Sequence, residues 1–169
     1  MKKRQIDDVF NCHFGAVTSL DWNYNDNFIA SSSSTGDIIV HNFNNKIPIS
    51  SFSSQNSTGV KMVKFQPQSS NIIASASNDG SVGIWDILRK QQQFNFEEIH
   101  NSRVTSVCFS PQNPILVCSG SLDKTIIFYD VQNNKKLKTL NCDTPITSIA
   151  FHSNGHNLAC ESASRAQYD

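Results

Sequence analysis

The sequence predicts an all-β fold made of repeated sheets, and two independent columns of residues carry that prediction. The first column is a run of small polar residues followed by an apolar strand, and it starts at Ser31, Ser75 and Ser119. The three segments read SSSSTGDIIVHN, SASNDGSVGIWD and SGSLDKTIIFYD, and their starts lie 44 residues apart each time. A fixed period of this kind indicates one supersecondary unit per repeat.

The second column is a strand in which an aromatic residue follows a β-branched residue five positions later. The β-branched residues are Val17, Val60, Val104 and Ile146, and the aromatic residues are Trp22, Phe65, Phe109 and Phe151. The β-branched residues lie 43, 44 and 42 residues apart. Alternation along the third copy predicts that Val104 and Val107 face opposite sides of the sheet, with apolar character on both sides.

Turn-forming residues separate the strands and support antiparallel hairpins. They occur at positions 23–27, 35–37, 78–80, 111–114, 133–134 and 154–155. Spacings of this order suit strands in a small all-β unit. No segment sustains a helical apolar period, so we expect helices to be absent or very short.

A strand that ends in Trp-Asp within such a period is typical of WD40 repeats in β-propellers. Trp85-Asp86 is that dipeptide, and Tyr129-Asp130 is a variant of it. The sequence therefore resembles the WD40 repeat family. The resemblance implies an outer strand of a preceding blade at residues 4–10, blades at 13–55, 56–99 and 100–141, and an incomplete blade at 142–169. About three and a half blades are fewer than the four or more that close a propeller, so we expect a partial propeller that this chain alone does not close.

The resemblance also implies a buried hydrogen-bond network in each blade, made of a turn Asp, a His, a Ser or Thr and the Trp. The residues expected in this structural network are Asp79, Trp85, His100, Ser119, Asp123 and Tyr129. The third unit matches best, with Ser121 as the alternative to Ser119, although Tyr129 lacks the indole donor.

The other two units depart further from the pattern. The second unit has Asn56 at the histidine position. The first unit keeps His13 but has Thr35 and His41 at the Asp and Trp positions. We therefore expect these two units to depend more on apolar stacking than on the polar network.

Charge and cysteine usage exclude several classes of protein. The chain has 14 basic and 14 acidic side chains, so no net field favours a nucleic acid or an anionic membrane. Its five cysteines are scattered without a Cys-x-x-Cys pair, which indicates neither a disulfide framework nor a zinc site. No signal peptide or membrane-length apolar stretch is evident, so we expect a cytoplasmic protein.

Catalytic, cofactor and metal functions are not expected. No phosphate-binding loop or nucleophile elbow occurs. His100 and Asp123 could pair as a dyad, but their spacing suits the structural network better. His152 and His156 flank a turn and have no third ligand nearby, so they do not indicate a metal site.

Partner proteins are expected to bind loops, since loops are the exposed, variable parts of such a scaffold. The candidate contact residues are His13, Phe14, Asn56, Asn101 and Arg103. An unclosed propeller exposes strand edges, so another chain that completes the propeller is a further candidate partner.

Longer segments are similar to one group within this family, the WD-repeat factors that target the γ-tubulin ring complex. They include VTSLDWNYNDNFIASSSSTGDIIVHN and KKLKTLNCDTPITSIAFHSNGHNLA, in which Asp143-Thr144-Pro145 replaces the usual Gly-His start. The resemblance implies a non-catalytic scaffold at centrosomes and spindles that supports microtubule nucleation. It would meet γ-tubulin complexes only indirectly, because these residues lack the helical region that binds them. The alternative is a general WD40 adaptor, such as a ubiquitin-ligase substrate receptor or an RNA-processing scaffold.

Overall fold

The computed structural model describes residues 10, 12–53, 58–97 and 99–162, in which fourteen strands and no helix occur. The first sheet contains β1 (Val17–Trp22), β2 (Phe28–Ser33), β3 (Asp37–Asn42) and β4 (Pro48–Ser53). The second contains β5 (Val60–Phe65), β6 (Ile72–Ser77), β7 (Val82–Asp86) and β8 (Gln91–Phe96). The third contains β9 (Val104–Phe109), β10 (Leu116–Ser121), β11 (Thr125–Asp130) and β12 (Lys135–Asn141). The fourth contains only β13 (Ile146–Phe151) and β14 (Leu158–Ser162).

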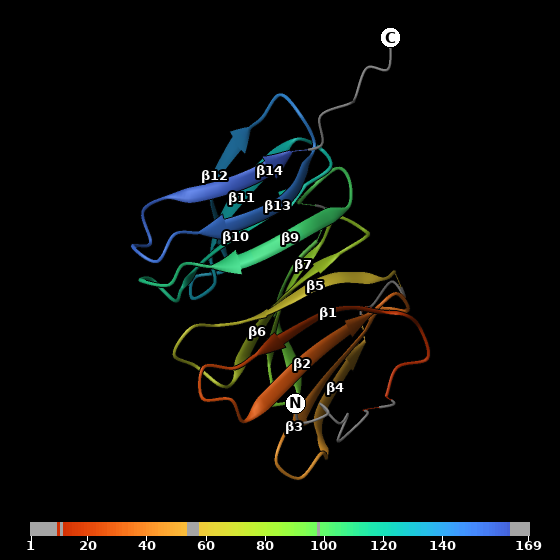
Figure 1. Cartoon of the computed structure of the whole chain (residues 1–169). Coiled ribbons are helices and arrows are strands. Elements are labelled where there is room, and N and C mark those ends of the chain that lie inside the picture. Colours follow the sequence, from red (N-terminus) through yellow and green to blue (C-terminus); the bar gives the residue numbers. More distant parts are fainter. Residues whose placement is uncertain (1–9, 11, 54–57, 98, 163–169) are drawn as a thin grey trace, which may run out of the picture.

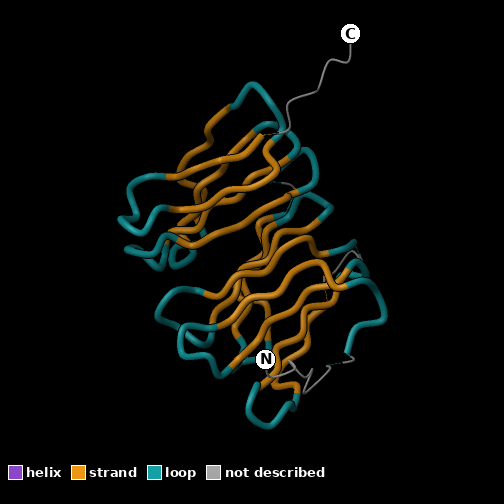
Figure 2. The backbone as a smooth tube through the Cα atoms, in the orientation of Figure 1, coloured by secondary structure: helices purple, strands orange, loops and turns teal. Residues whose placement is uncertain are grey.

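Each sheet is an antiparallel meander whose strands pair in chain order. The sheets also follow one another in chain order, from β1–β4 at the bottom of the view to β13–β14 at the top (Figure 1). The first strands of the sheets, β1, β5, β9 and β13, contact one another in succession. Loops gather at the two ends of the strands (Figure 2). The all-β class and the partial, unclosed propeller are thus confirmed, while all of the expected outer strand at 4–10 except Phe10 lies outside the described residues.

The tight turns between the second and third strands explain several of the polar residues in the repeat. In the β6–β7 turn, Asp79 Oδ1 accepts the Ser81 N–H at 2.9 Å and the Ser81 hydroxyl at 2.6 Å. Gly80 has a φ of 90°, a conformation that glycine adopts without strain. A Cβ at this position would collide with the carbonyl oxygen of His100. The turn therefore needs both its acid and its glycine.

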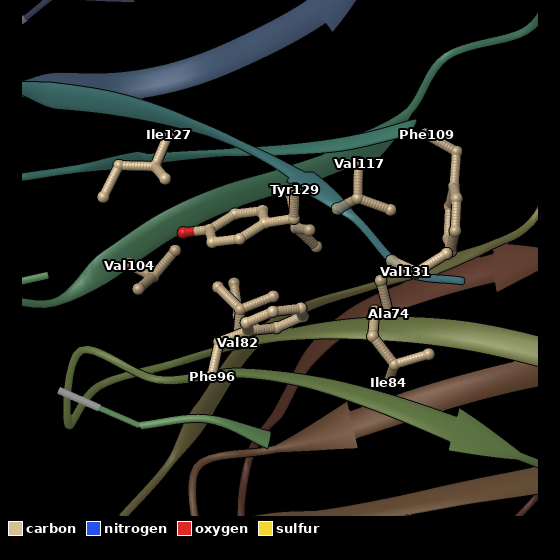
Figure 3. Packing of buried hydrophobic residues seen from close by; sticks show 12 residues of the cluster. Ala74, Val82, Ile84, Phe96, Val104, Phe109, Val117, Ile127, Tyr129 and Val131 are labelled. Carbon is tan, nitrogen blue, oxygen red and sulfur yellow. The ribbon is translucent and has the colours of Figure 1, made fainter. Parts of the chain in front are cut away.

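Most of the buried apolar side chains lie between consecutive sheets. Phe96 of the second sheet packs against Val104 and Tyr129 of the third (Figure 3). The ring centroids of Phe96 and Tyr129 are 4.7 Å apart, and those of Phe52 and Trp85 join the first two sheets at 5.1 Å. Full burial of one large apolar side chain is worth about 1.5–3 kcal/mol. Stacking of sheet on sheet is therefore the main source of stability.

Each first strand carries a β-bulge directly after its first residue. Pairing with the second strand skips one residue, at Thr18, Lys61, Thr105 and Thr147. The extra residue inverts the alternation of side chains beyond it. As a result Val104 and Val107 pack in the same cluster, and the prediction that they face opposite sides is wrong.

Two of the bulge threonines join neighbouring sheets. Thr18 Oγ1 donates to the carbonyl oxygen of Val60 at 2.5 Å. Thr105 Oγ1 lies 2.8 Å from the carbonyl oxygen of Ile146 and 3.0 Å from that of Gly120. The bulge thus directs a hydroxyl between two sheets, and the hydroxyl links their first strands.

The substitution Thr105→Val tests this link. We expect a loss of about 1–2 kcal/mol in the free energy of unfolding, because the valine keeps the shape but cannot donate to Ile146. The control is Thr147→Val, since Thr147 is exposed and bonds only within its own sheet, to Glu161. We expect the control to change stability by less than about 0.5 kcal/mol. Urea unfolding measures both values, and equal losses would contradict the role of Thr105.

Candidate protein-interaction site

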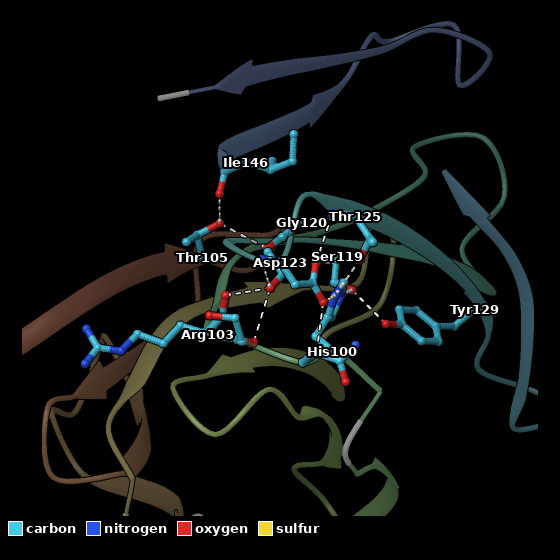
Figure 4. A network of polar contacts seen from close by, with 12 residues as sticks. His100, Arg103, Thr105, Ser119, Gly120, Asp123, Thr125, Tyr129 and Ile146 are labelled. Carbon is cyan, nitrogen blue, oxygen red and sulfur yellow. Dashed lines mark hydrogen bonds and ion pairs between the residues drawn. The ribbon is translucent and has the colours of Figure 1, made fainter. Parts of the chain in front are cut away.

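Four side chains form a continuous hydrogen-bonded chain inside the third sheet (Figure 4). His100 precedes β9, Ser119 lies on β10, Asp123 in the β10–β11 turn and Tyr129 on β11. His100 Nδ1 is 3.0 Å from Asp123 Oδ2, and His100 Nε2 is 2.7 Å from Ser119 Oγ. Ser119 Oγ is in turn 2.7 Å from Tyr129 Oη. The structure thus brings together four of the six residues that the sequence assigns to the network.

The electrostatics of this chain fix the direction of its hydrogen bonds. Burial lowers the pKa of His100, although the charge and the hydrogen bond of Asp123 act in the opposite direction. The imidazole is therefore neutral at neutral pH. We assign Nδ1–H as the donor to Asp123 and Nε2 as the acceptor from Ser119, whose oxygen accepts the Tyr129 hydroxyl. Tyr129 thus takes the donor role that an indole would have.

Asp123 is held as a carboxylate by several donors. Burial alone raises the pKa of Asp123, but hydrogen bonds from the Thr125 hydroxyl and the Asn101 N–H, together with His100, outweigh it and leave the pKa lowered. The Thr125 hydroxyl lies 2.7 Å from Asp123 Oδ1, and the Asn101 nitrogen lies 2.9 Å from Oδ2. Sequence reasoning missed Thr125. A hydroxyl two residues after the turn acid, as at Ser81, was the signal that could have found it.

The second sheet keeps part of the same arrangement. Trp85 Nε1 donates to Ser75 Oγ at 2.8 Å, so the indole and the serine pair inside the sheet. Asp79 accepts from Ser81 in the turn, as described above. Asn56, at the expected histidine position, lies outside the described residues. The described part of this sheet therefore shows the serine–indole contact and the turn acid.

The first sheet uses a different combination of residues. His13 Nε2 lies 2.7 Å from Ser31 Oγ, which matches the histidine–serine contact of the third sheet. Thr35 Oγ1 donates to Asp37 Oδ2 at 2.9 Å, so the acid and the hydroxyl have exchanged places in the turn. His41 is buried at the position of the tryptophan, and burial lowers the pKa of both histidines.

The order Ser119, His100 and Asp123 has the connectivity of a hydrolase triad, but its surroundings differ. Ser119 is 0% exposed and His100 is 3% exposed. The Ser119 oxygen also accepts the Tyr129 hydroxyl and has no open side toward solvent. The geometry therefore supports a structural role, in which the network ties the loop before β9 to the sheet.

The candidate contact residues differ in how far they reach solvent. Phe14 is fully exposed in the loop before β1. Asn101 and Arg103 are exposed in the loop before β9 and line a polar hollow together with Asn78. His13 is only half-buried, but its ring is already engaged by Ser31. Among the candidate contact residues that the structure describes, Phe14, Asn101 and Arg103 are therefore exposed and available to a partner.

A larger feature is the uncovered apolar face of the first sheet, which the candidate residues did not include. Val17, Leu20 and Trp22 are 54%, 62% and 45% exposed. In the second sheet the same columns hold Val60, Val63 and Phe65, which are 1%, 0% and 7% exposed. The first sheet covers this face of the second sheet. We call the uncovered face of the first sheet, formed by Val17, Leu20 and Trp22, the open face.

The open face is also hollowed. Phe10, Ile29 and His41 line an apolar depression together with Val17 and Leu20. Exposed apolar patches of this kind mark interaction sites. The sequence contained a signal for the open face. Its repeat columns place apolar residues on the open face just as they do at the buried positions Val60, Val63 and Phe65.

Other kinds of site find no support in the described part of the chain. No group of three or more His, Cys, Asp or Glu side chains there is arranged to hold a metal ion. His152 and His156 lie at the β13–β14 turn, where His152 Nδ1 accepts the Asn154 N–H at 3.2 Å. The described residues also contain no helix long and apolar enough to cross a membrane.

Removal of the Tyr129 hydroxyl tests the network. We expect Tyr129→Phe to lower the free energy of unfolding by about 1 kcal/mol, because Ser119 loses its donor inside the sheet. Tyr24→Phe is the matched control, since Tyr24 is 62% exposed. Thermal or urea unfolding compares the two variants, and an unchanged Tyr129→Phe would show that the hydroxyl contributes nothing.

Two buried histidines, His41 and His100, and the half-buried His13 make stability depend on pH. Burial lowers the pKa of His13, His41 and His100 below the ordinary value of 6.5, so the unfolded chain binds protons that the folded chain does not. The resulting stability is complete above pH 6.5 and is lost as pH falls below it. We expect the urea midpoint to fall between about pH 7.5 and pH 5. A flat or opposite trend in unfolding experiments across that range would contradict this assignment.

Comparison with family models identifies the repeat. Residues 4–42, 46–86, 91–130 and 134–165 match the model described as WD domain, G-beta repeat. The second and third matches each begin with the outer strand of one sheet and continue through three strands of the next, so each repeat unit ties two sheets together. Comparison with curated proteins gives no match. The chain belongs to the WD40 repeat family, whose domains generally mediate protein–protein interactions.

Proposed function

We propose that this chain is a non-catalytic scaffold that supports microtubule nucleation at centrosomes and spindles, in the manner of the WD-repeat factors that target the γ-tubulin ring complex. The observation that supports the scaffold role is the match of four segments to the WD40 repeat model. The surface proposed for the partner is the open face, where Leu20 is 62% exposed. The γ-tubulin assignment is supported by the similarity of residues 17–42 and 135–159 to that group.

The repeat itself defines what the open face should bind. The first and second sheets each offer the next one a small residue on the second strand, branched residues on the third and a ring on the fourth. In the second sheet these are Ala74, Val82, Ile84 and Phe96, and in the first they are Ala30, Ile38, Val40 and Phe52. We propose that the open face binds a WD-type blade of a partner chain with the same surface.

A targeted charge on the open face tests this proposal. The chain fused to a fluorescent protein is expressed in dividing cells that carry labelled γ-tubulin, and we expect it to concentrate at spindle poles. Leu20→Glu should abolish this enrichment, because burial of a leucine is worth about 1.5–3 kcal/mol and burial of an unpaired carboxylate costs more. Leu137→Glu is the control, since Leu137 is 51% exposed on the outer strand β12.

The outcomes separate the candidate functions. A diffuse wild-type chain would overturn the assignment to the γ-tubulin system. Enrichment that survives Leu20→Glu would place the binding surface elsewhere. Self-association of the purified chain in sedimentation experiments, abolished by Leu20→Glu, would replace the partner blade with a second copy. Co-purification with a ubiquitin-ligase cullin or an RNA-processing particle, in place of γ-tubulin components, would favour the general adaptor.

A further inference from the structure

We propose that Cys108 and Cys118 form a peroxide-oxidisable dithiol in the third sheet, in which Cys108 reacts first and Cys118 closes a disulfide. This inference is independent of the proposed function. It rests on the placement of the two cysteines, on the residues that surround Cys108, and on the difference in exposure between them.

The two cysteines lie directly opposite each other on paired strands. Cys108 of β9 and Cys118 of β10 are register partners, and their sulfur atoms are 3.3 Å apart. Opposite residues on antiparallel strands have Cα atoms about 4.5–5.5 Å apart. Disulfides span Cα separations of roughly 4.4–6.8 Å, so a bond of about 2.05 Å needs only a small side-chain movement.

Cys108 occupies a position that holds an anion in the first sheet. The same column, one residue before the aromatic, contains Asp21, Lys64, Cys108 and Ala150. In the first sheet Asp21 Oδ2 accepts the backbone N–H of Phe65 at 2.7 Å, and Asp21 Oδ1 pairs with Lys64 Nζ at 2.8 Å. Cys108 occupies the place of that carboxylate two interfaces further along, next to the fourth sheet.

The surroundings of Cys108 favour its thiolate. The hydrogen bond with Cys118 lowers the pKa of Cys108, and the Phe151 N–H and the charge of Lys64 act in the same direction against burial. The same contact and burial raise the pKa of Cys118. Cys108 is half-buried and Cys118 is buried. A partly exposed thiol of lowered pKa next to a buried thiol is the arrangement of redox-sensing cysteine pairs.

The reaction is balanced with a hydroperoxide as the oxidant. The Cys108 thiolate attacks the peroxide O–O bond, becomes a sulfenic acid and, with one proton taken up, releases water or an alcohol. Cys118 sulfur then attacks the Cys108 sulfur, the S–OH bond breaks, and the thiol proton leaves with the hydroxide as a second water. Two thiols have lost two electrons to the peroxide, and a dithiol reductant reverses the change.

The disulfide would act at the interface between the third and fourth sheets. Cys118 packs there with Ile146 and Ile149, and Cys108 and Phe151 flank the same cluster. Formation of the disulfide removes the free Cys108 sulfur that the Phe151 N–H contacts. We expect the fourth sheet, which has only two described strands, to respond first to that loss.

Mass spectrometry of the folded chain tests the proposal directly. Trypsin releases residues 104–124, between Arg103 and Lys124, as one peptide with both cysteines. After brief treatment with hydrogen peroxide and then an alkylating agent, we expect this peptide to lack two hydrogens and to carry no alkyl group. Dithiothreitol should restore two alkylation sites. The internal control is the peptide of residues 139–165, which contains Cys142 and Cys160 and should stay alkylated.

Two variants borrow residues from other repeats to limit damage to the fold. Cys118→Ala installs the residue found at Ala30 and Ala74, and Cys108→Ala installs that of Ala150. With Cys118→Ala we expect Cys108 to accumulate as a sulfenic acid that dimedone traps. With Cys108→Ala we expect no label on the buried Cys118. Circular dichroism confirms that both variants remain folded.

Three results would overturn the proposal. The first is a peptide 104–124 that remains fully alkylated after peroxide treatment of the wild-type chain. The second is oxidation of the Cys142 and Cys160 peptide at the same rate, which would show that the pair has no special reactivity. The third is equal dimedone labelling of wild type and Cys118→Ala, since Cys118 would then resolve nothing.

Discussion

The packing of one sheet on the next is the constraint on which this structure depends. Each complete sheet is apolar on both faces, and all of this apolar surface is buried only where neighbours cover both of them. Within the chain this condition is met at the second sheet, where Val63 is 0% exposed. At the first sheet it is met on one face only, and Leu20 remains 62% exposed. Positions that are buried between sheets elsewhere in the chain are therefore exposed on the open face.

Hydrogen bonds between the sheets fix how the stacked sheets are oriented relative to one another. The bulge after the first residue of each inner strand turns Thr18 and Thr105 toward the next sheet, and their hydroxyls reach its backbone carbonyls. Asp21 makes an equivalent link through the Phe65 N–H. Such bonds depend on geometry in a way that apolar contact does not. They set how each sheet sits on its neighbour, and the position of Cys108 among them is what gives a redox change a structural consequence.

The histidine network has a different purpose, since it holds a loop to its own sheet. Its members vary between sheets, with Tyr129 in place of an indole and His41 in place of Trp85, yet the third-strand position is filled by a buried side chain in all three sheets. A donor at the third strand satisfies the serine in the third sheet as an indole does in the second. The candidate contact residues Phe14 and Arg103 lie close in sequence to His13 and His100, which the network holds in place.

The sequence by itself determined the repeat and the all-β class, because these depend on period, turn chemistry and side-chain type, which are local properties. The resemblance to WD40 repeats supplied His100, Asp123 and Tyr129, and the fold placed Ser119 rather than Ser121 against His100. The sequence did not reveal that Val104 and Val107 share a face, since the bulge between them depends on pairing with β10. Thr125 and the contact between Cys108 and Cys118 also emerged only from the fold. The exposure of the open face also emerged only from the fold, because equivalent apolar positions are buried or exposed according to which sheet lies beside them. Burial depends on which residues are neighbours in space, and a single sequence does not identify those neighbours.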